Sequence, residues 1–155
     1  MSLKDPTSKM SKSHTDERSR ILLTDTPEEI HRKLKGALTD SEPQIAYDPS
    51  HRPGVSNLIE ILSYFEDKSC DEVALEFQYS SLRALKEHAA NKISNRLQPI
   101  REKYLSLVED KTGYVEAVAN QGAQAARSNA EQTIKQVKNK LGLWNFSGWF
   151  ILDKK

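Results

Sequence analysis

Apolar residues recur at every third or fourth position through most of the chain, which is the spacing of an amphipathic α-helix. The pattern predicts five helices: one from Pro27 to Thr39–Asp40, one from Val55 to about Phe65, and three at about residues 70–77, 81–109 and 114–141. Strand signals are almost absent. The sequence therefore predicts an all-α chain, a helical bundle preceded by a polar loop.

Capping residues support two of the predicted helix starts. Thr26 precedes Pro27 and two acidic residues, which is typical of a helix N-terminus. Ser69 and Glu72 have the spacing of a capping box. Within the fourth helix, Pro99 is expected to kink or split the helix, because proline lacks the backbone N–H.

Four of the predicted helices carry apolar stripes that are candidates for the core. They are Ile30, Leu34 and Leu38; Val55, Leu58, Leu62 and Phe65; Leu82, Leu85, Ala89, Ile93, Leu97 and Ile100; and Val115, Val118, Gly122, Ala126, Ala130, Ile134, Val137 and Leu141. We expect the polar lead of about twenty residues to add nothing to the core. The run Ile21–Leu23 is either an edge strand or an anchored loop. Because two stripes are narrow, we expect some apolar faces to pack against a missing partner.

Composition narrows the class of protein. The chain has 155 residues and a formal net charge of +1. A single cysteine, Cys70, excludes an internal disulfide, and no apolar stretch is long enough to cross a bilayer. The four histidines lack the spacing of zinc ligands, so no metal site is predicted. We therefore expect a soluble protein that does not bind a membrane.

The polar lead contains one candidate for chemistry, the pentapeptide Lys9-Met10-Ser11-Lys12-Ser13. Two lysines supply positive charge and two serines supply hydroxyl donors, a combination that can hold phosphate groups. The alternative for a lysine- and serine-rich pentapeptide is a solvated basic tail.

The pentapeptide is also the KMSKS signature of class I aminoacyl-tRNA synthetases, and it stands in a series of similar segments. These are Met1–Pro6 (MSLKDP), Leu22–Ile30 (LLTDTPEEI), Ala37–Asp40 (ALTD) and Tyr47–Leu58 (YDPSHRPGVSNL). In this order they resemble the tryptophanyl-tRNA synthetases of bacteria and mitochondria. The resemblance covers about residues 1–141 and is looser after residue 60.

The resemblance implies a function and a site. Residues Lys9, Met10, Ser11, Lys12 and Ser13 would bind ATP, and Lys12 together with Lys9 would be catalytic, with Lys12 stabilising the departing pyrophosphate. The implied activity is tryptophan–tRNA ligation, with tryptophan, ATP, tRNA(Trp) and Mg²⁺, in a homodimer. One departure is His14, which stands where the family usually has aspartate.

The resemblance also implies a division of the chain. Residues 1–25 would be the KMSKS segment at the end of a nucleotide-binding domain, residues 26–141 a helical anticodon-binding domain, and residues 142–155 an atypical tail. Because no Rossmann pattern is present, we expect the chain to be the C-terminal part of the enzyme. The alternative is a non-catalytic helical fragment that binds tRNA or another RNA. The tail is interpreted either as non-coding read-through or a gene-model error, or as an apolar anchor to a membrane surface or a partner.

Basic residues gather on the last two predicted helices: Arg83, Lys86, Lys92, Arg96, Arg101 and Lys103, then Arg127, Lys135, Lys138 and Lys140. Such a face can hold an RNA backbone, although solvated helix faces with mixed charge pairs explain the same pattern. The loop around Ser41-Glu42-Pro43 looks closest to fungal mitochondrial versions. The expected compartment is therefore the mitochondrial matrix, with the bacterial cytoplasm as the alternative.

Overall fold

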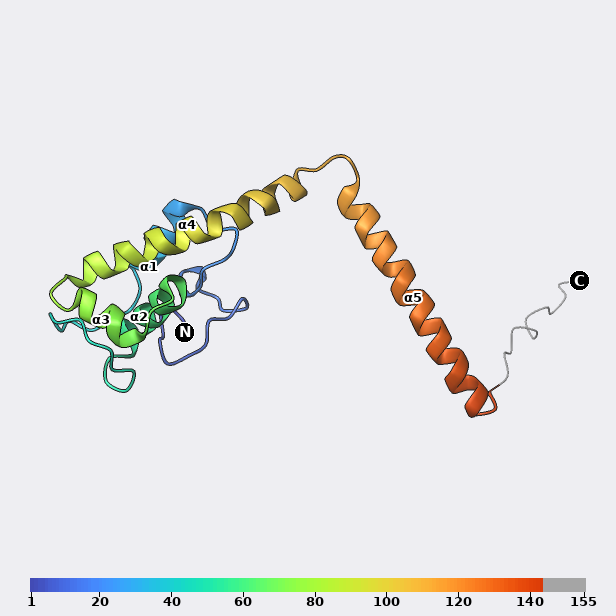
Figure 1. The fold of residues 1–155 in the computed structure, drawn as a ribbon, viewed down its shortest axis with the longest axis horizontal. Helices are drawn as coiled ribbons and strands as arrows, with labels where there is room; N and C mark the ends of the chain where they lie inside the picture. The colour runs from blue at the N-terminus through green and yellow to red at the C-terminus, as the bar shows by residue number, and fades with distance from the viewer. Residues whose placement is uncertain (144–155) are drawn as a thin grey trace, which may run out of the picture. The chain divides into compact units, whose positions relative to one another are not determined.

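The computed structural model describes residues 1–143, and the chain divides into two units, Met1–Ser106 and Leu107–Lys155. All regular structure in the described residues is helical, which confirms the predicted fold class (Figure 1). The elements are η1 (Glu17–Ser19), a short 3₁₀ turn, and the α-helices α1 (Pro27–Lys35), α2 (Pro53–Glu66), α3 (Cys70–Phe77), α4 (Leu82–Val108) and α5 (Tyr114–Lys140). Most of the predicted tail, residues 144–155, lies outside the described residues.

The predicted capping boxes are present. The Thr26 hydroxyl accepts a hydrogen bond from the backbone N–H of Glu29, whose carboxylate accepts one from the N–H of Thr26. Ser69 and Glu72 form the same pair of bonds at the start of α3. Each box satisfies two of the backbone donors that a helix N-terminus leaves without a partner.

The end of α1 differs from the prediction, because the helix stops at Lys35 rather than at Thr39–Asp40. Beyond Gly36 the backbone N–H of Leu38 donates instead to the carbonyl of Leu3. This contact between segments far apart in sequence redirects the chain. Leu38 is consequently 56% exposed and does not belong to the core, contrary to expectation.

Helix α2 buries seven of its residues and starts against the backbone that follows α1. A Cβ atom on Gly54 would lie 2.3 Å from the carbonyl oxygen of Leu38, so only glycine allows the two backbones to approach this closely. Val55, Leu58 and Leu62 are fully buried, as predicted, whereas Phe65 at the end of the stripe is exposed.

Helix α4 is continuous through Pro99 over 27 residues, so the proline does not split it. The predicted stripe is buried at Leu85, Ala89 and Ile93. Ile100 is 47% exposed and was wrongly placed in the core, because the apolar packing on α4 ends with Leu97.

Helix α5 has almost the predicted bounds, but none of its residues is buried. Val115, Val118, Ile134 and Val137 are all exposed. No helix among the described residues is long and apolar enough to cross a membrane.

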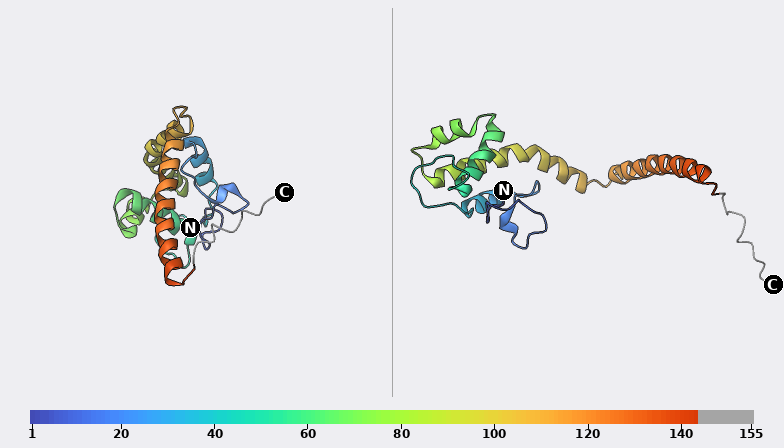
Figure 2. Two further views of the ribbon diagram at one scale, coloured as in Figure 1. Left: turned by 90° about the vertical axis from the view of Figure 1, so that its right-hand side faces the viewer. Right: turned by 90° about the horizontal axis from the view of Figure 1, so that it is seen from below.

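The core of the first unit includes part of the polar lead, contrary to expectation. Leu3 is 1% exposed and belongs to the same apolar cluster as the stripes of α1, α2 and α4, and Met10 and Ile21 pack against that cluster. Figures 1 and 2 show the N-terminal segment, in dark blue, beside α1 and α2. No strand forms at Ile21–Leu23, so of the two alternatives the anchored loop is correct.

Candidate functional site: a basic loop with a buried base

The pentapeptide Lys9–Ser13 lies in a loop whose two ends are joined by backbone hydrogen bonds. The N–H of Ser2 donates to the carbonyl of Ser8 at 2.8 Å, and the N–H of Leu3 donates to the carbonyl of Ser19 at 2.9 Å. Ser2, Leu3 and Ser19 are all buried. Residues on both sides of the pentapeptide are therefore held at one buried point.

Helix α2 holds this base from the other side. The Asn57 side chain accepts a hydrogen bond from the nitrogen of Met1 at 2.8 Å and donates to the Met1 carbonyl at 3.3 Å. Asn57 is itself only 4% exposed. Two of the segments that carry the family resemblance, MSLKDP and RPGVSNL, thus contact one another through a buried amide.

The tip of the loop presents its charges to solvent. Lys9 and Lys12 are exposed, and neither ammonium group forms an ion pair within residues 1–143. The Ser11 and Ser13 hydroxyl oxygens lie 3.0 Å apart. Met10 points the other way, because its sulfur accepts a hydrogen bond from the Ile21 N–H at 3.4 Å. The two lysines and two hydroxyls are thus available to an anionic ligand, while Met10 attaches the tip to the core.

The residues after the pentapeptide form a polar turn around His14. The His14 Nδ1 atom accepts the N–H of Asp16 at 3.0 Å, and Arg20 donates to the His14 carbonyl at 2.8 Å. Hydrogen bonds from the side chain and backbone of Arg18 lower the pKa of Asp16 to about 2. Arg20 connects the turn to the segment that enters the core, a role that no sequence motif indicated.

A buried ion pair holds the segment that follows the loop. Lys33 of α1 contacts the Asp25 carboxylate at 2.5 Å, and both side chains are 7% exposed. The same carboxylate accepts the N–H of Leu22, while Arg101 of α4 donates to the Asp25 carbonyl at 2.7 Å. Arg101 is therefore a buried structural residue, which corrects its place among the exposed cations expected to contact RNA.

The proline-rich segment between α1 and α2 is held by a second polar network. The guanidinium of Arg52 donates to both oxygens of Asp40 and to the carbonyl of Gln44. Removal from water, together with a hydrogen bond to Glu60, raises the pKa of Tyr47 to about 12. The Ser56 hydroxyl of α2 accepts the N–H of Asp48. The polar residues of this proline-rich segment therefore hold the segment together and attach it to α2.

A third cluster pairs α2 with α4. The Glu66 carboxylate, 6% exposed, lies 2.7 Å from the His88 ring nitrogen and 3.0 and 3.1 Å from the Lys92 and Lys68 ammonium groups. Burial alone would raise its pKa, but these hydrogen bonds together lower the pKa of Glu66 to about 2. Lys92 is therefore paired with a carboxylate of the fold, although its side chain is 46% exposed, whereas Arg101 is buried.

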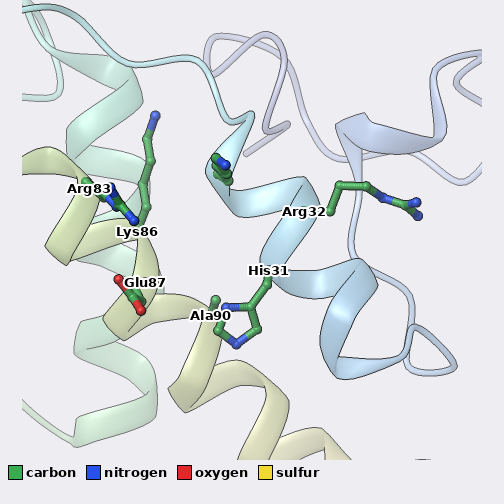
Figure 3. A pocket seen from close by; sticks show the side chains of 7 residues that line it. His31, Arg32, Arg83, Lys86, Glu87 and Ala90 are labelled. Atoms are coloured by element: carbon green, nitrogen blue, oxygen red, sulfur yellow. The ribbon is translucent and has the colours of Figure 1, made fainter.

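The cations that remain on the first half of α4 border a pocket of about 460 Å³ between α1 and α4. Figure 3 shows Arg83, Lys86 and Glu87 on α4 opposite His31 on α1, with the Arg32 side chain directed away from α4. Lys35 completes the charged lining. The sequence showed basic residues on α4 but gave no sign that α1 would add to them.

The described residues include no cluster of three or more histidine, cysteine, aspartate or glutamate side chains that could hold a metal ion. The polar chemistry at the tip of the loop is cationic and hydroxylic, which suits an anion.

Comparison with known proteins adds three findings. Residues 1–98 match the family of tRNA synthetases class I (W and Y). The tryptophan–tRNA ligases of Rickettsia conorii and Caldanaerobacter subterraneus are each 40% identical, over 142 and 143 residues, which is 92% of this chain and 43% of each relative. The ligase of Bacillus subtilis is 34% identical over 143 residues.

A solved structure, the tryptophanyl-tRNA synthetase of Mycoplasma pneumoniae, is similar with a TM-score of 0.71 at 27% identity. The similarity covers 93% of this chain and 43% of that one. The chain thus spans less than half the length of the relatives it matches.

Proposed function

This chain belongs to the family of tRNA synthetases class I (W and Y), and from that premise we propose that it supplies the ATP loop and the helical tRNA-binding part of a tryptophan–tRNA ligase. The observation that carries the proposal is the exposed, basic tip of the loop on a buried base, in a chain 40% identical to proteins named tryptophan–tRNA ligase. These names also favour the ligase over a non-catalytic RNA-binding fragment.

In the proposed reaction the tryptophan carboxylate attacks the α-phosphate of ATP and pyrophosphate leaves. Negative charge grows on the departing pyrophosphate, so the ammonium groups of Lys12 and Lys9 would lower the barrier by stabilising it. Ser11 and Ser13 would donate hydroxyl hydrogen bonds to phosphate oxygens. Met10 would hold the tip to the core through the Ile21 N–H, so that the lysines and serines stay in a defined position beside the phosphates.

Mg²⁺, which the family implies, would be bound mainly by the ATP phosphates and by residues beyond this chain. Mg²⁺ at nucleotide sites is usually held by substrate phosphates with only one or two carboxylates, so the proposal needs no cluster of metal ligands among residues 1–143. No step of the proposal depends on a metal held by the residues described.

The remaining parts of the proposal concern partners and compartment. tRNA(Trp) is the proposed partner of the helical part, and the homodimer that the family implies stays a prediction for light scattering to test. The relatives named above are bacterial, which is consistent with the bacterial cytoplasm and gives no support to the mitochondrial matrix.

The test uses a chimera in which the preceding part of the Rickettsia conorii ligase is joined to this chain. We expect tryptophan-dependent exchange of pyrophosphate into ATP, and we expect Lys12→Ala to lower kcat for exchange by roughly 100-fold. Tryptophan affinity, measured by calorimetry, should change by less than about twofold, because Lys12 would act on charge that develops only in the transition state.

Lys111→Ala is the matched control, since Lys111 is an exposed lysine far along the chain from the loop. Equal losses of exchange and tryptophan affinity in the Lys12 variant would contradict the transition-state role. A folded chimera that binds tryptophan and ATP but shows no exchange would contradict the proposed function itself. The 155-residue chain alone is expected to show no exchange.

A further inference from the structure

The pocket between α1 and α4 has a charge pattern that the ATP loop does not explain. Its lining brings together Lys35 and Arg32 of α1 with Arg83 and Lys86 of α4, and Glu87 is the one carboxylate in that lining. Arg32 is directed away from α4 (Figure 3) and lies 3.8 Å from Glu29. Lys35, Arg83 and Lys86 are the other cations of the lining.

Two of the nearby ammonium groups also have structural roles. Lys86 donates to the Ala37 carbonyl at 2.8 Å, and Lys4 donates to the Gly36 carbonyl at 2.7 Å. These bonds satisfy carbonyls at the C-terminal end of α1, where cations are favourable. They account for the positions of Lys4 and Lys86, whereas Arg83 and Lys35 form no ion pair within residues 1–143.

The positive charges around this pocket repel one another. Burial of the Lys86 side chain, and then the nearby charge of Lys4, lower the pKa of Lys86 below its usual value. Glu87 offsets only part of this charge. An anion in the pocket would relieve the repulsion among the cations, and the guanidinium of Arg83 could form two parallel hydrogen bonds to it.

We infer that the pocket between α1 and α4 is a binding site for a phosphate group, with Arg83 and Lys35 as its main contacts and Lys86 as a further cation of the lining. The phosphate is either a phosphodiester of an RNA backbone or free inorganic phosphate. The RNA source rests on the proposed function, because a helical tRNA-binding part needs sequence-independent contacts to the backbone. An acidic peptide is the competing occupant.

The site differs from the basic face expected from the sequence. That face was a row of cations along α4, of which Arg101 is buried against Asp25 and Lys92 is paired with Glu66. The pocket instead joins the first half of α4 to α1 and so gathers charge from segments about fifty residues apart. A concave site holds one phosphate group in a defined position, whereas a solvated row of charges does not.

The test uses the 155-residue chain and three probes: a fluorescein-labelled RNA hairpin, inorganic phosphate, and a polyglutamate peptide. Binding of the hairpin is measured by anisotropy at several salt concentrations, and binding of the small anion by amide chemical shifts of α1 and α4. Arg83→Gln and Lys35→Gln are the main variants, because both side chains are exposed and make no hydrogen bond that the fold requires.

We expect each variant to weaken hairpin binding by about tenfold, and to reduce the slope of log affinity against log salt by about one. Glu87→Gln should have the opposite effect and strengthen binding, because it removes the carboxylate from the lining. Lys111→Gln removes the same charge elsewhere and should change affinity by less than about twofold. Shifts on adding inorganic phosphate alone, lost in the same two variants, would also support the site and would identify the free anion as its source.

Three results would overturn the inference: no response to the hairpin or to phosphate, equal losses in Lys111→Gln and Arg83→Gln, or polyglutamate binding as tightly as the hairpin. None of these measurements depends on adenylate formation. A ligase without this site would retain exchange in the chimera while the pocket variants bind RNA like the parent chain. A phosphate site without ligase function would show weaker RNA binding in the pocket variants and no exchange in the chimera.

Discussion

Helices α4 and α5 are both 27 residues long and both carry apolar residues at every third or fourth position, yet their surroundings differ completely. Seven residues of α4 are buried, among them Leu85 and Ile93, whereas α5 buries none. The α4 stripe meets α1, α2 and the N-terminal segment in one apolar cluster. The middle of the α5 stripe consists of residues with small or no side chains, Gly122, Ala126 and Ala130, and the stripe is exposed to solvent.

The difference shows that periodicity specifies a helix and a stripe but not the burial of that stripe. Helix α5 is stabilised by local features, including the Asp110 carboxylate, which accepts the N–H of Tyr114 at 3.1 Å, and the lysines of its last turn. Helix α4 gains in addition from burial and from long-range polar contacts. Substitutions should therefore have much larger effects on the free energy of unfolding in α4 and its contacts than in α5.

The largest effect on the free energy of unfolding is expected from Lys33→Ala, which breaks the ion pair with Asp25, the residue that Arg101 of α4 contacts. This change leaves the buried Asp25 carboxylate without its cation and should lower the free energy of unfolding by roughly 3–5 kcal/mol. Urea unfolding followed by circular dichroism measures it. The matched change on α5, Lys135→Ala, should cost less than about 0.5 kcal/mol. Equal effects would show that the Asp25 site is hydrated in solution.

The apolar stripes are compared by Leu85→Ala and Ile134→Ala. Leu85 is fully buried, so truncation removes packing and leaves a cavity, which should cost about 2–5 kcal/mol. Ile134 is 52% exposed, and its truncation should change unfolding by less than about 0.5 kcal/mol. A large loss for Ile134→Ala in urea unfolding would mean that α5, like α4, is packed in solution.

A fall in pH should affect the contacts of α4 but not those of α5, because Glu66 of α2, which pairs with His88 and Lys92 of α4, has a pKa lowered from 4.5 to about 2. A carboxyl with a lowered pKa in the folded state stabilises fully above its unfolded value, and this contribution is lost as the pH falls from about 4.5 towards 2. Since the paired cations are partly exposed, the contribution should be about 1–2 kcal/mol. Glu66→Gln should flatten this part of the stability curve, whereas Glu131→Gln on α5 should leave it unchanged. A curve that keeps its shape in the Glu66 variant would refute the assignment.

The smallest effect concerns helix capping. Ser69→Ala removes the capping box of α3 and should cost about 1 kcal/mol of the free energy of unfolding. Asp110→Ala removes the corresponding contact of α5 and should reduce helical ellipticity without changing the unfolding midpoint of the first unit. Hydrogen exchange of the Glu72 and Tyr114 amides checks both outcomes. A shifted midpoint in the Asp110 variant would show that the two units unfold together.

The helix starts could be predicted because their determinants are local. Thr26 with Glu29, and Ser69 with Glu72, satisfy backbone donors three residues away, so the pattern is complete within one turn. The end of α1 could not be predicted in the same way. It depends on the bond from Leu38 to Leu3, and on the close approach of Gly54, contacts that span sixteen to thirty-five residues.

The candidate site likewise has a part that could be predicted from the sequence and a part that could not. The pentapeptide Lys9–Ser13 is contiguous, so its charge and hydroxyls were visible in the sequence, and the exposure of both lysines agrees with the hypothesis that they bind ATP without testing it. The parts that support the loop, Asn57 and the Asp25–Lys33 pair, were invisible as functional features. An asparagine in a helix pattern has no signature that reveals a partner 56 residues away.

By itself the sequence determined the helical class, the capped helix starts and the signature loop, because each follows from residues within a few positions of one another. The tertiary structure decided which cations face solvent. Arg101 is buried on Asp25, Lys92 is paired with Glu66, and Arg83 meets Lys35 of another helix at a pocket. Burial and charge convergence depend on which surfaces meet, and a single helix does not contain that information.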